Sequence, residues 1–435
     1  MRLIRVIISF LASLAVLAVD GGCSHASTLE ETPYIMVGEA GVRVYDEVKP
    51  SLRTSDIPVL FFTDRLNEQA DPDGPPVYGR DRSDGAQFGR ATIELSPELT
   101  WEELVADSTS PSRQRIEMTM GEVEILGEFA PIRDRLVVES GRLVYPSESS
   151  AGLARDLADF DAAIEPWLEP GNDNAAIVYV HGVYTPFDRS VFRLADAWHA
   201  AGRDGVPIVF SWPTGRKGLL PFAYAHDQES GDFSVRDLKL LLTALARNER
   251  IARVHLIAWS RGNEVATTAV RELNEEILAS RGQTWMAQIA RSYDETERVE
   301  TLDRLRGVAE VLKLDTLMLI AADIDLGVFE ERVFAERVVH AANRVVVYTS
   351  LTDKALDIAD LFAQSGARLG QARAENMDPT IVRLIADLPS LEMIECRVPS
   401  DDVHGYVFEH PGALSDMIRI IRDDAPIGEE HGRPL

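Results

Sequence analysis

The stretch from residue 254 to residue 262 reads VHLIAWSRG, a mainly apolar run that leads into a serine flanked by small residues. A short apolar run of this kind is typical of a buried strand. Directly after it, Val265, Ala269 and Leu273 recur at helical spacing, which predicts a helix with one buried face. Ser260 is therefore expected on the turn that joins a buried strand to a helix.

This turn is a variant of the pattern G-x-S-x-G, with Ala258 at the first small position and Gly262 at the second. In that pattern a strained strand-to-helix turn exposes the serine hydroxyl above a sheet, and small neighbours allow two backbones to approach closely. The pattern makes Ser260 a candidate nucleophile. The alternative is that Ser260 only shapes the turn or caps the helix, as serines at such positions often do.

Apolar runs alternate with helical patterns through the rest of the chain, which predicts an α/β protein with a mostly parallel, doubly wound sheet covered on both faces. Ser234 is expected to begin one helix, with Asp237 completing an approximate capping box. Residues 67–85 are rich in Gly, Pro and Asp and predict a loop. The expected strands cover residues 59–63, 91–95, 122–126, 136–138, 175–180, 207–212, 254–258, 316–321, 345–348 and 391–396.

The strand over residues 175–180 ends in His181-Gly182-Val183-Tyr184. In enzymes with the serine turn described above, this loop supplies one donor to the oxyanion and the residue after the serine supplies the other. The backbone N–H groups of Val183 and Arg261 are therefore the candidate oxyanion donors. The alternative is a plain strand end with a packed histidine.

A serine hydroxyl needs a base to become a good nucleophile, and in this class an acid and then a histidine follow the serine along the chain. Four of the nine histidines follow Ser260: His340, His404, His410 and His431. His404 is favoured because it lies in the loop after the last expected strand, and His410, just before the last helix, is the alternative.

Three aspartates are candidates for the acid. Asp353 follows the expected strand at 345–348, and Asp323 and Asp325 follow the strand at 316–321. The position of its loop favours Asp353, with Asp323 as the alternative acid. Any of the three could instead cap a turn or a helix, which is what most aspartates at strand ends do.

Charge and composition exclude several classes of function. The chain has 44 Lys and Arg against 71 Asp and Glu, a formal net charge of −27, which argues against nucleic acid as a partner. Only two cysteines occur, Cys23 and Cys396, so a disulfide framework or a Cys-rich metal site is excluded. The sequence contains no P-loop, no dinucleotide-binding glycine pattern and no H-E-x-x-H. We therefore expect neither a metal nor a cofactor, and infer no protein partner.

The first residues predict export. Arg2 and Arg5 precede an apolar run over residues 6–19, which is typical of a signal peptide and short for a membrane span of ~20 residues. Gly21-Gly22-Cys23-Ser24 is similar to a bacterial lipobox, with Asp20 where that motif has an aliphatic residue. The expectation is a signal peptide over residues 1–22 and lipidation at Cys23, which would tether the protein to a membrane of the cell envelope. The alternative is an ordinary cleavage site at residues 24–26 and simple secretion.

The motifs together resemble the α/β-hydrolase superfamily and, more narrowly, the bacterial group known as α/β hydrolases of unknown function, DUF900. The resemblance spans roughly residues 58–422 and departs from the family at Trp259 and Arg261, where His and Met are usual. It implies the α/β-hydrolase fold and a Ser-Asp-His triad, without naming a substrate. The motifs that carry it are residues 61–65 (FFTDR), 78–80 (YGR), 180–182 (VHG), 210–213 (FSWP), 258–262, 321–325, 348–353 and 404–406 (HGY).

The expected protein is an exported serine hydrolase that cleaves carboxylic esters of small molecules or lipids through an acyl-enzyme. Ser260 would attack, His404 would carry the proton and Asp353 would orient the imidazole. The alternatives are acyl transfer to an acceptor other than water, and a non-catalytic binding or scaffold protein of the cell envelope on a degenerate hydrolase fold. Residues 27–57 are expected to form a tether or edge segment, and residues 58–425 one catalytic domain with a charge-rich helical insertion at 274–312.

Overall fold

The computed structural model describes residues 27–29, 44–71, 74–110, 114–131, 137–140, 142–144, 147–171, 173–215, 220–280, 307–334, 336–363, 366–397 and 404–424. The expected signal peptide with Cys23, the middle of the expected insertion (281–306) and His431 lie outside these residues. Among the helices of the described residues, none combines the length and apolar character that crossing a membrane would require.

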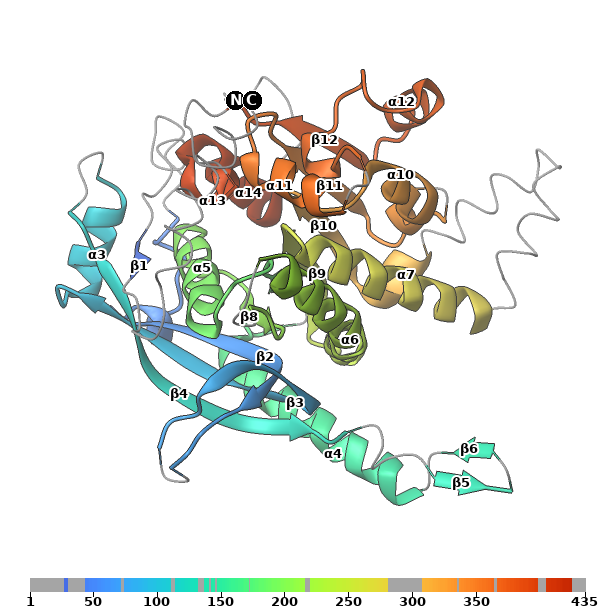
Figure 1. Cartoon of the computed structure of the whole chain (residues 1–435). Helices are drawn as coiled ribbons and strands as arrows, with labels where there is room; N and C mark the ends of the chain where they lie inside the picture. The colour runs from blue at the N-terminus through green and yellow to red at the C-terminus, as the bar shows by residue number, and fades with distance from the viewer. Residues whose placement is uncertain are drawn as a thin grey trace.

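One ten-stranded sheet organises the molecule (Figure 1). Its order is β1-β4-β3-β2-β8-β7-β9-β10-β11-β12. The strands from β2 to β12 pair in parallel, whereas β1, β4, β3 and β2 pair antiparallel at one end. The mostly parallel sheet with added N-terminal strands is thus confirmed. The strands are β1 Ser27–Thr28, β2 Ile57–Asn67, β3 Tyr78–Ser96, β4 Glu117–Phe129, β7 Asn174–Val180, β8 Val206–Ser211, β9 Ile251–Trp259, β10 Leu314–Ile320, β11 Arg344–Thr349 and β12 Leu391–Glu395.

Helices cover both faces of the sheet because its central strands are apolar on both sides. On β7, Val178 and Tyr179 point to opposite faces and both are buried. Helices α5 and α14 pack on one face, and α6 and α7 lie side by side on the other (Figure 1). The helices are α3 Trp101–Ser108, α4 Ser147–Ile164, α5 Phe187–Ala200, α6 Leu220–Arg247, α7 Gly262–Ser280, α10 Leu326–Val328, α11 Lys354–Ala363, α12 Pro379–Ala386, α13 Tyr406–Glu409 and α14 Pro411–Asp423.

The strand order reverses direction between β7 and β9, which makes this position a candidate site. The chain goes from β7 to β8 on one side and then returns to β9 on the other side of β7. In open parallel sheets, ligands bind in the crevice beyond the carboxyl ends of the strands at such a reversal. Those ends carry Gly182 and Ser260, the two positions that the sequence motifs indicated.

Two local predictions were wrong. Residues 67–85 do not form a loop throughout, because β3 begins at Tyr78 and its polar start pairs with the end of β2. Ser234 lies inside α6 rather than at its start, since the helix begins at Leu220. The strand expected at 136–138 is confirmed as β5 Val137–Glu139, which pairs with β6 Arg142–Val144 outside the main sheet (Figure 1).

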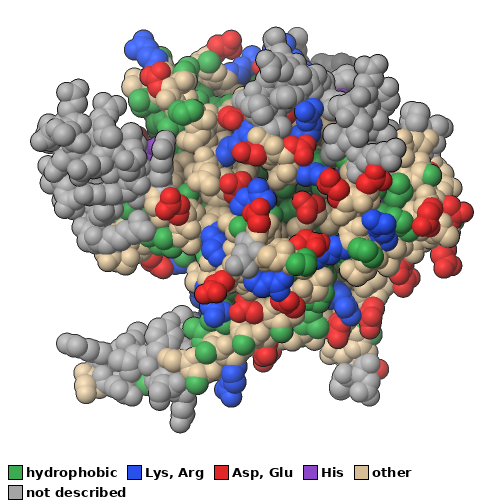
Figure 2. Space-filling view, turned by 180° about the vertical axis from the view of Figure 1, so that it is seen from behind, with side chains coloured by type: hydrophobic (Ala, Val, Ile, Leu, Met, Phe, Trp, Pro, Cys, Tyr) green, Lys and Arg blue, Asp and Glu red, His purple; other side chains and the backbone are tan. Residues whose placement is uncertain are grey.

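The surface carries charges of both signs. On the face shown in Figure 2, acidic and basic side chains are interspersed rather than gathered into separate fields. A mixed surface of this kind favours solubility.

Candidate active site

Ser260 occupies a strained turn between β9 and α7. Its φ is +55°, a left-handed conformation that costs a non-glycine residue on the order of 1–3 kcal/mol. Three backbone hydrogen bonds hold it. Ser260 N–H donates to Ile320 O at 3.0 Å, and the N–H groups of Asp323 and Asn263 each donate to Ser260 O at 3.2 Å. The side-chain amide of Asn263 also donates to Ser260 O, at 2.7 Å. The neighbouring strand and the first helical turn therefore stabilise the strained conformation.

Two glycines allow the end of β7 to touch this turn. A Cβ atom at Gly262 would lie 2.4 Å from the carbonyl oxygen of His181 and 2.6 Å from that of Val180. A Cβ atom at Gly182 would lie 2.6 Å from the Cβ atom of Ser260. Real Cβ contacts are essentially never this short, so both positions require glycine. The loop after β7 and the serine turn are in direct backbone contact.

The structure brings Ser260, His404 and Asp353 together. His404 Nε2 lies 2.6 Å from Ser260 Oγ, and His404 Nδ1 lies 2.8 Å from Asp353 Oδ2. Asp353 is fully buried, Ser260 is almost so, and the His404 side chain keeps 21% of its surface exposed. The three residues come from the ends of β9 and β11 and from the segment just before α13.

Asp353 also begins helix α11. Its Oδ1 atom accepts hydrogen bonds from the backbone N–H groups of Ala355 at 3.0 Å and Leu356 at 3.3 Å. These groups have no partner within the helix, so the carboxylate caps it. The two roles that the sequence allowed for this aspartate, helix cap and partner of a histidine, both hold for the same side chain.

The other candidate acids have different partners. Asp323 accepts a hydrogen bond from the Tyr224 hydroxyl at 2.6 Å and lies 3.4 Å from the guanidinium of Arg368. Asp325 caps the short helix α10 by accepting from Val328 N–H at 3.1 Å. Asp353 is thus the acid that the structure places at His404.

The other histidines of the described segments that follow the serine lie in helix-end positions. His410 occupies the residue before α14, and its N–H donates to Tyr406 O at 3.1 Å. His340 ends a 3₁₀ turn over Val338–His340. His404 is the histidine that the structure places at Ser260.

The backbone N–H groups of Val183 and Arg261 are available to a ligand. In the described part of the chain neither group has an intramolecular acceptor, although the next residue, Tyr184, donates its N–H to Asp227 Oδ2 at 3.2 Å. Val183 follows β7 and Arg261 follows the serine, so the contact between the two turns brings both near Ser260. An oxyanion hole needs two such donors beside the nucleophile.

Trp259 supports the histidine, a role that the sequence did not reveal. Its indole Nε1–H donates to the carbonyl oxygen of His404 at 2.9 Å. The two rings are also in contact, with centroids 5.1 Å apart and a 45° tilt. A tryptophan beside the nucleophile indicated only a different pocket wall, because nothing in the sequence shows that residues 259 and 404 meet.

Arg261 belongs to a partly buried polar cluster beside the serine. Its Nη1 atom donates to the carbonyl oxygen of Asp323 at 3.3 Å, and its guanidinium carbon lies 5.9 Å from the centre of the Tyr224 ring. Burial opposes the charge, but Tyr224 and Asp323 together raise the pKa of Arg261 above its ordinary value. The side chain therefore stays charged and is held by Asp323 and Tyr224.

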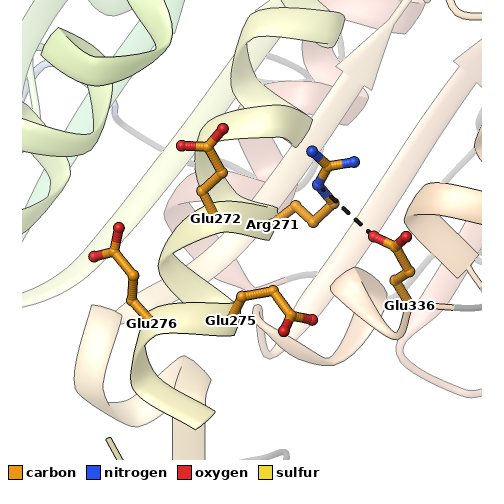
Figure 3. A pocket seen from close by; sticks show the side chains of 5 residues that line it. All are labelled: Arg271, Glu272, Glu275, Glu276 and Glu336. Carbon is orange, nitrogen blue, oxygen red and sulfur yellow. Dashed lines mark ion pairs between the residues drawn. The ribbon is translucent and has the colours of Figure 1, made fainter. Parts of the chain in front are cut away.

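A separate hollow lies further along α7 (Figure 3). Its volume is about 560 Å³, and it is lined by Arg271, Glu272, Glu275, Glu276 and Glu336. Arg271 pairs with Glu336 at 3.7 Å, while Lys239 of α6 pairs with Glu272 at 3.1 Å and with Glu276 at 2.5 Å. Arg271 is roughly 14 Å along the helix from Gly262. We assign this hollow no part in the chemistry at Ser260.

The comparison with protein families agrees with the fold. Residues 158–388 match the family described as alpha/beta hydrolase of unknown function (DUF900). The protein belongs to this family of α/β hydrolases, and the resemblance that its motifs indicated is confirmed. The family description establishes a hydrolase fold and names no substrate.

Several solved structures are distantly similar to the chain. An esterase of Pyrobaculum calidifontis has 12% identity over 60% of this chain and 80% of that one, with a TM-score of 0.31. An uncharacterized protein of Bacillus cereus has 11% identity over 64% of this chain and 71% of that one, with a TM-score of 0.33. Esterase B of Lactobacillus rhamnosis, inhibited by a tributyrin phosphonate, has 9% identity over 59% of this chain and 77% of that one, with a TM-score of 0.31. No curated protein matches the sequence. At these identities and scores the similarities carry no argument about substrate.

Proposed function

We propose that the protein is a serine hydrolase that cleaves carboxylic esters through an acyl-enzyme. One observation carries the proposal: a continuous hydrogen-bonded path runs from buried Asp353 through His404 to Ser260, with 2.8 Å and 2.6 Å between the bonded atoms. The serine on that path sits on a strained turn. A turn serine with a purely structural role needs neither partner.

The geometry indicates how each residue would act. Ser260 Oγ attacks the carbonyl carbon while His404 Nε2 takes the hydroxyl proton, and the N–H groups of Val183 and Arg261 bind the oxygen that becomes negative. Collapse of this intermediate breaks the ester C–O bond, and His404 gives the proton to the departing alcohol. Water then attacks the acyl-enzyme by the same route and releases the acid and free serine.

Asp353 would fix the tautomer of the histidine. A carboxylate at Nδ1 keeps the proton on that nitrogen, which leaves Nε2 free to act as the base. The first N–H groups of α11 hold the other carboxylate oxygen, and the positive end of the helix favours its negative charge. The acid is thus held in one orientation.

The test is a series of p-nitrophenyl esters of increasing acyl length, assayed with the wild type, Ser260→Ala and Ser280→Ala. Ser280 ends the same helix and is exposed, so it is a matched control. We expect the wild type and Ser280→Ala to cleave at least one ester, and Ser260→Ala to lose at least ~10³-fold in kcat. Full activity in Ser260→Ala would refute the proposal. Inactivity of the wild type towards every ester would favour the scaffold alternative, and transfer of the acyl group to an added alcohol would favour the acyltransferase.

We also propose that the protein is exported and lipidated at Cys23. Strand β1 begins at Ser27 and pairs with β4 at the edge of the sheet. Four residues span at most ~14 Å, so a lipid on Cys23 would hold the sheet edge close to the membrane. Intact-mass analysis of membrane fractions from the producing bacterium should show diacylglyceryl and acyl additions at Cys23. An unmodified, soluble chain that starts at Ser27 would instead establish simple secretion.

A further inference from the structure

Arg65, near the end of β2, is a buried cation that joins separate parts of the chain. Its side chain is 1% exposed. Its Nε atom donates to Ser211 Oγ at 2.9 Å, Nη1 to Gly79 O at 2.9 Å and Nη2 to Thr185 O at 2.7 Å. Three edges of one guanidinium therefore reach β8, β3 and the loop after β7.

These partners explain sequence motifs that the triad leaves without a role. The motifs at residues 61–65, 78–80 and 210–213 contain Arg65, Gly79 and Ser211. All three meet at this guanidinium, although they are far apart in the sequence. The same guanidinium also contacts the loop after β7, which belongs to the candidate site.

That loop carries Val183, the proposed oxyanion donor. Hydrogen bonds hold the loop both before Val183, at His181, and after it, at Thr185. Thr185 O accepts from Arg65 and also from Thr214 Oγ1 at 2.8 Å. On the other side, Nε2 of His181 lies 3.3 Å from Arg65 Nη2. A guanidinium can only donate, so Nε2 accepts, and Nδ1 carries the proton that it gives to Gly182 O at 2.8 Å.

His181 is fixed in its neutral form. Its ring is fully buried and stacks on Trp212, with centroids 5.4 Å apart and planes 5° apart. Burial and the neighbouring Arg65 hold the pKa of His181 well below its usual value. The neutral imidazole thus accepts from Arg65 and donates to Gly182 O, and so it connects Arg65 to the start of the loop.

We propose that Arg65 is a positioning residue of the oxyanion hole, which holds the loop over residues 181–185 at the distance from Ser260 that Val183 requires to donate. The inference rests on the serine-hydrolase function proposed above. Gly182 touches the serine turn, so any shift of the loop changes the position of Val183 relative to the nucleophile. Oxyanion donors act over a narrow range of about 2.7–3.1 Å, and a misplacement of about 1 Å can cost ~10²-fold in rate.

Lysine cannot replace arginine here. The planar guanidinium offers five donors in a fixed fork, whereas an ammonium is a single point on a flexible stem. A lysine at position 65 would keep the charge and lose at least one of the contacts to Gly79 O, Ser211 Oγ and Thr185 O. Arg65→Lys is therefore the informative variant.

Arg203→Lys is the matched control. Arg203 is 2% exposed, and its Nη1 atom donates to Leu52 O at 2.8 Å and Asp56 O at 3.0 Å. It precedes β8 at Val206, at the amino ends of the strands and away from Ser260. The same substitution there should lower the melting temperature similarly without affecting an oxyanion hole.

The experiment measures kcat, KM, the melting temperature and the Ki of a trifluoromethyl ketone, which forms a reversible oxyanion adduct with an active serine. We expect Arg65→Lys to lower kcat roughly ten- to a hundredfold and to change KM less than about threefold. The Ki of the ketone should rise by the same factor by which kcat/KM falls. Thr214→Val removes the second hydrogen bond to Thr185 O, so it should lower kcat/KM and raise the Ki of the ketone by a smaller factor. Arg203→Lys should leave both kcat/KM and this Ki unchanged.

Unchanged kcat in Arg65→Lys, or a loss of kcat without weaker ketone binding, would overturn the inference. If Arg65→Lys does not fold, Thr214→Val decides: parallel losses in kcat/KM and ketone affinity support the inference, and ketone affinity equal to wild type refutes it. A wild type that neither cleaves esters nor binds the ketone would refute the hydrolase function itself, and this inference with it.

Discussion

Asp353 contacts His404 and the start of helix α11 with the two oxygens of one carboxylate. Oδ2 lies 2.8 Å from His404 Nδ1, while Oδ1 accepts from the N–H of Ala355 at 3.0 Å. Both contacts therefore depend on one orientation of the carboxylate. The helix therefore holds the acid in the orientation that the histidine needs.

This double contact predicts different outcomes for two substitutions. Asparagine also caps helices well, so Asp353→Asn should keep the melting temperature within a few degrees while kcat falls by ~10⁴ because the imidazole tautomer is no longer fixed. Asp353→Ala should lose the same activity and, in addition, about 1 kcal/mol of unfolding free energy for the lost cap.

Two other aspartates serve as controls for that series. Asp378 caps α12 by accepting from Thr380 N–H at 2.7 Å, and Asp378→Asn should retain wild-type kcat. Asp323→Asn should act through stability, because it leaves the buried Arg368 without its carboxylate. A large loss of kcat in Asp323→Asn with near-normal kcat in Asp353→Asn would show that the acid has been assigned to the wrong residue.

A second prediction concerns the close approach at Gly262. Gly262→Ala places a Cβ atom 2.4 Å from the carbonyl oxygen of His181, and two backbones must separate to admit it. We expect a loss of more than about 2 kcal/mol in unfolding free energy and of most activity, measured by urea unfolding and ester assay.

Gly152→Ala is the matched control, since Gly152 lies in α4 with its nearest neighbour atom 3.9 Å from the added Cβ. Alanine in an open helix position should stabilise by about 0.5–1 kcal/mol and leave activity unchanged. Equal effects of the two substitutions would argue against the contact between β7 and the serine turn.

The third prediction concerns Trp259 as a support for His404. Trp259→Phe keeps an aromatic ring but removes the donor to His404 O. A net hydrogen bond of about 1 kcal/mol corresponds to roughly a fivefold change in rate, so kcat should fall by about that factor with little change in melting temperature. In Trp198→Phe, where the lost bond is to Asp204 O at 2.8 Å, stability should fall and kcat should stay constant. Similar kcat values in Trp259→Phe and wild type would refute the role.

A fourth prediction follows from Asp64, which is fully buried and accepts from Ser234 Oγ at 2.5 Å. Burial and the nearby Asp237 raise the pKa of Asp64 to about 7 in the folded state. The folded state therefore binds this proton more tightly than the unfolded chain, and the stability from the protonated form is lost as pH rises from about 4 to 7. Each tenfold difference in proton affinity between the two states corresponds to ~1.4 kcal/mol.

Asp64→Asn should remove this part of the pH dependence. Between about pH 4 and pH 8 the wild type should lose on the order of a few kcal/mol of unfolding free energy that Asp64→Asn does not lose. Urea unfolding across that range measures it, with the exposed cap variant Asp378→Asn as the reference. Parallel curves for Asp64→Asn and wild type would contradict the assignment.

Local patterns predicted the parts of the structure that local physics determines. The apolar run before Ser260 and the helical spacing after it are sufficient to place the turn, and the order of Ser260, Asp353 and His404 narrows the triad to a few candidates. The start of β3 at Tyr78 could not be seen, because its polar residues become a strand only when β2 offers a partner. The roles of Arg65 and Trp259 depend on tertiary contacts with Thr185 and His404, which no sequence spacing encodes.

The most direct test of the central claim is the site of covalent labelling by a fluorophosphonate, mapped by peptide mass spectrometry on the full chain. Only an activated serine attacks this reagent readily, since an ordinary serine hydroxyl is a poor nucleophile. We predict one stoichiometric adduct on Ser260, absent in Ser260→Ala and much slower to form in Asp353→Asn. Labelling that persists in Ser260→Ala, or a folded wild type that takes up no label, would contradict the assignment of Ser260 as the nucleophile.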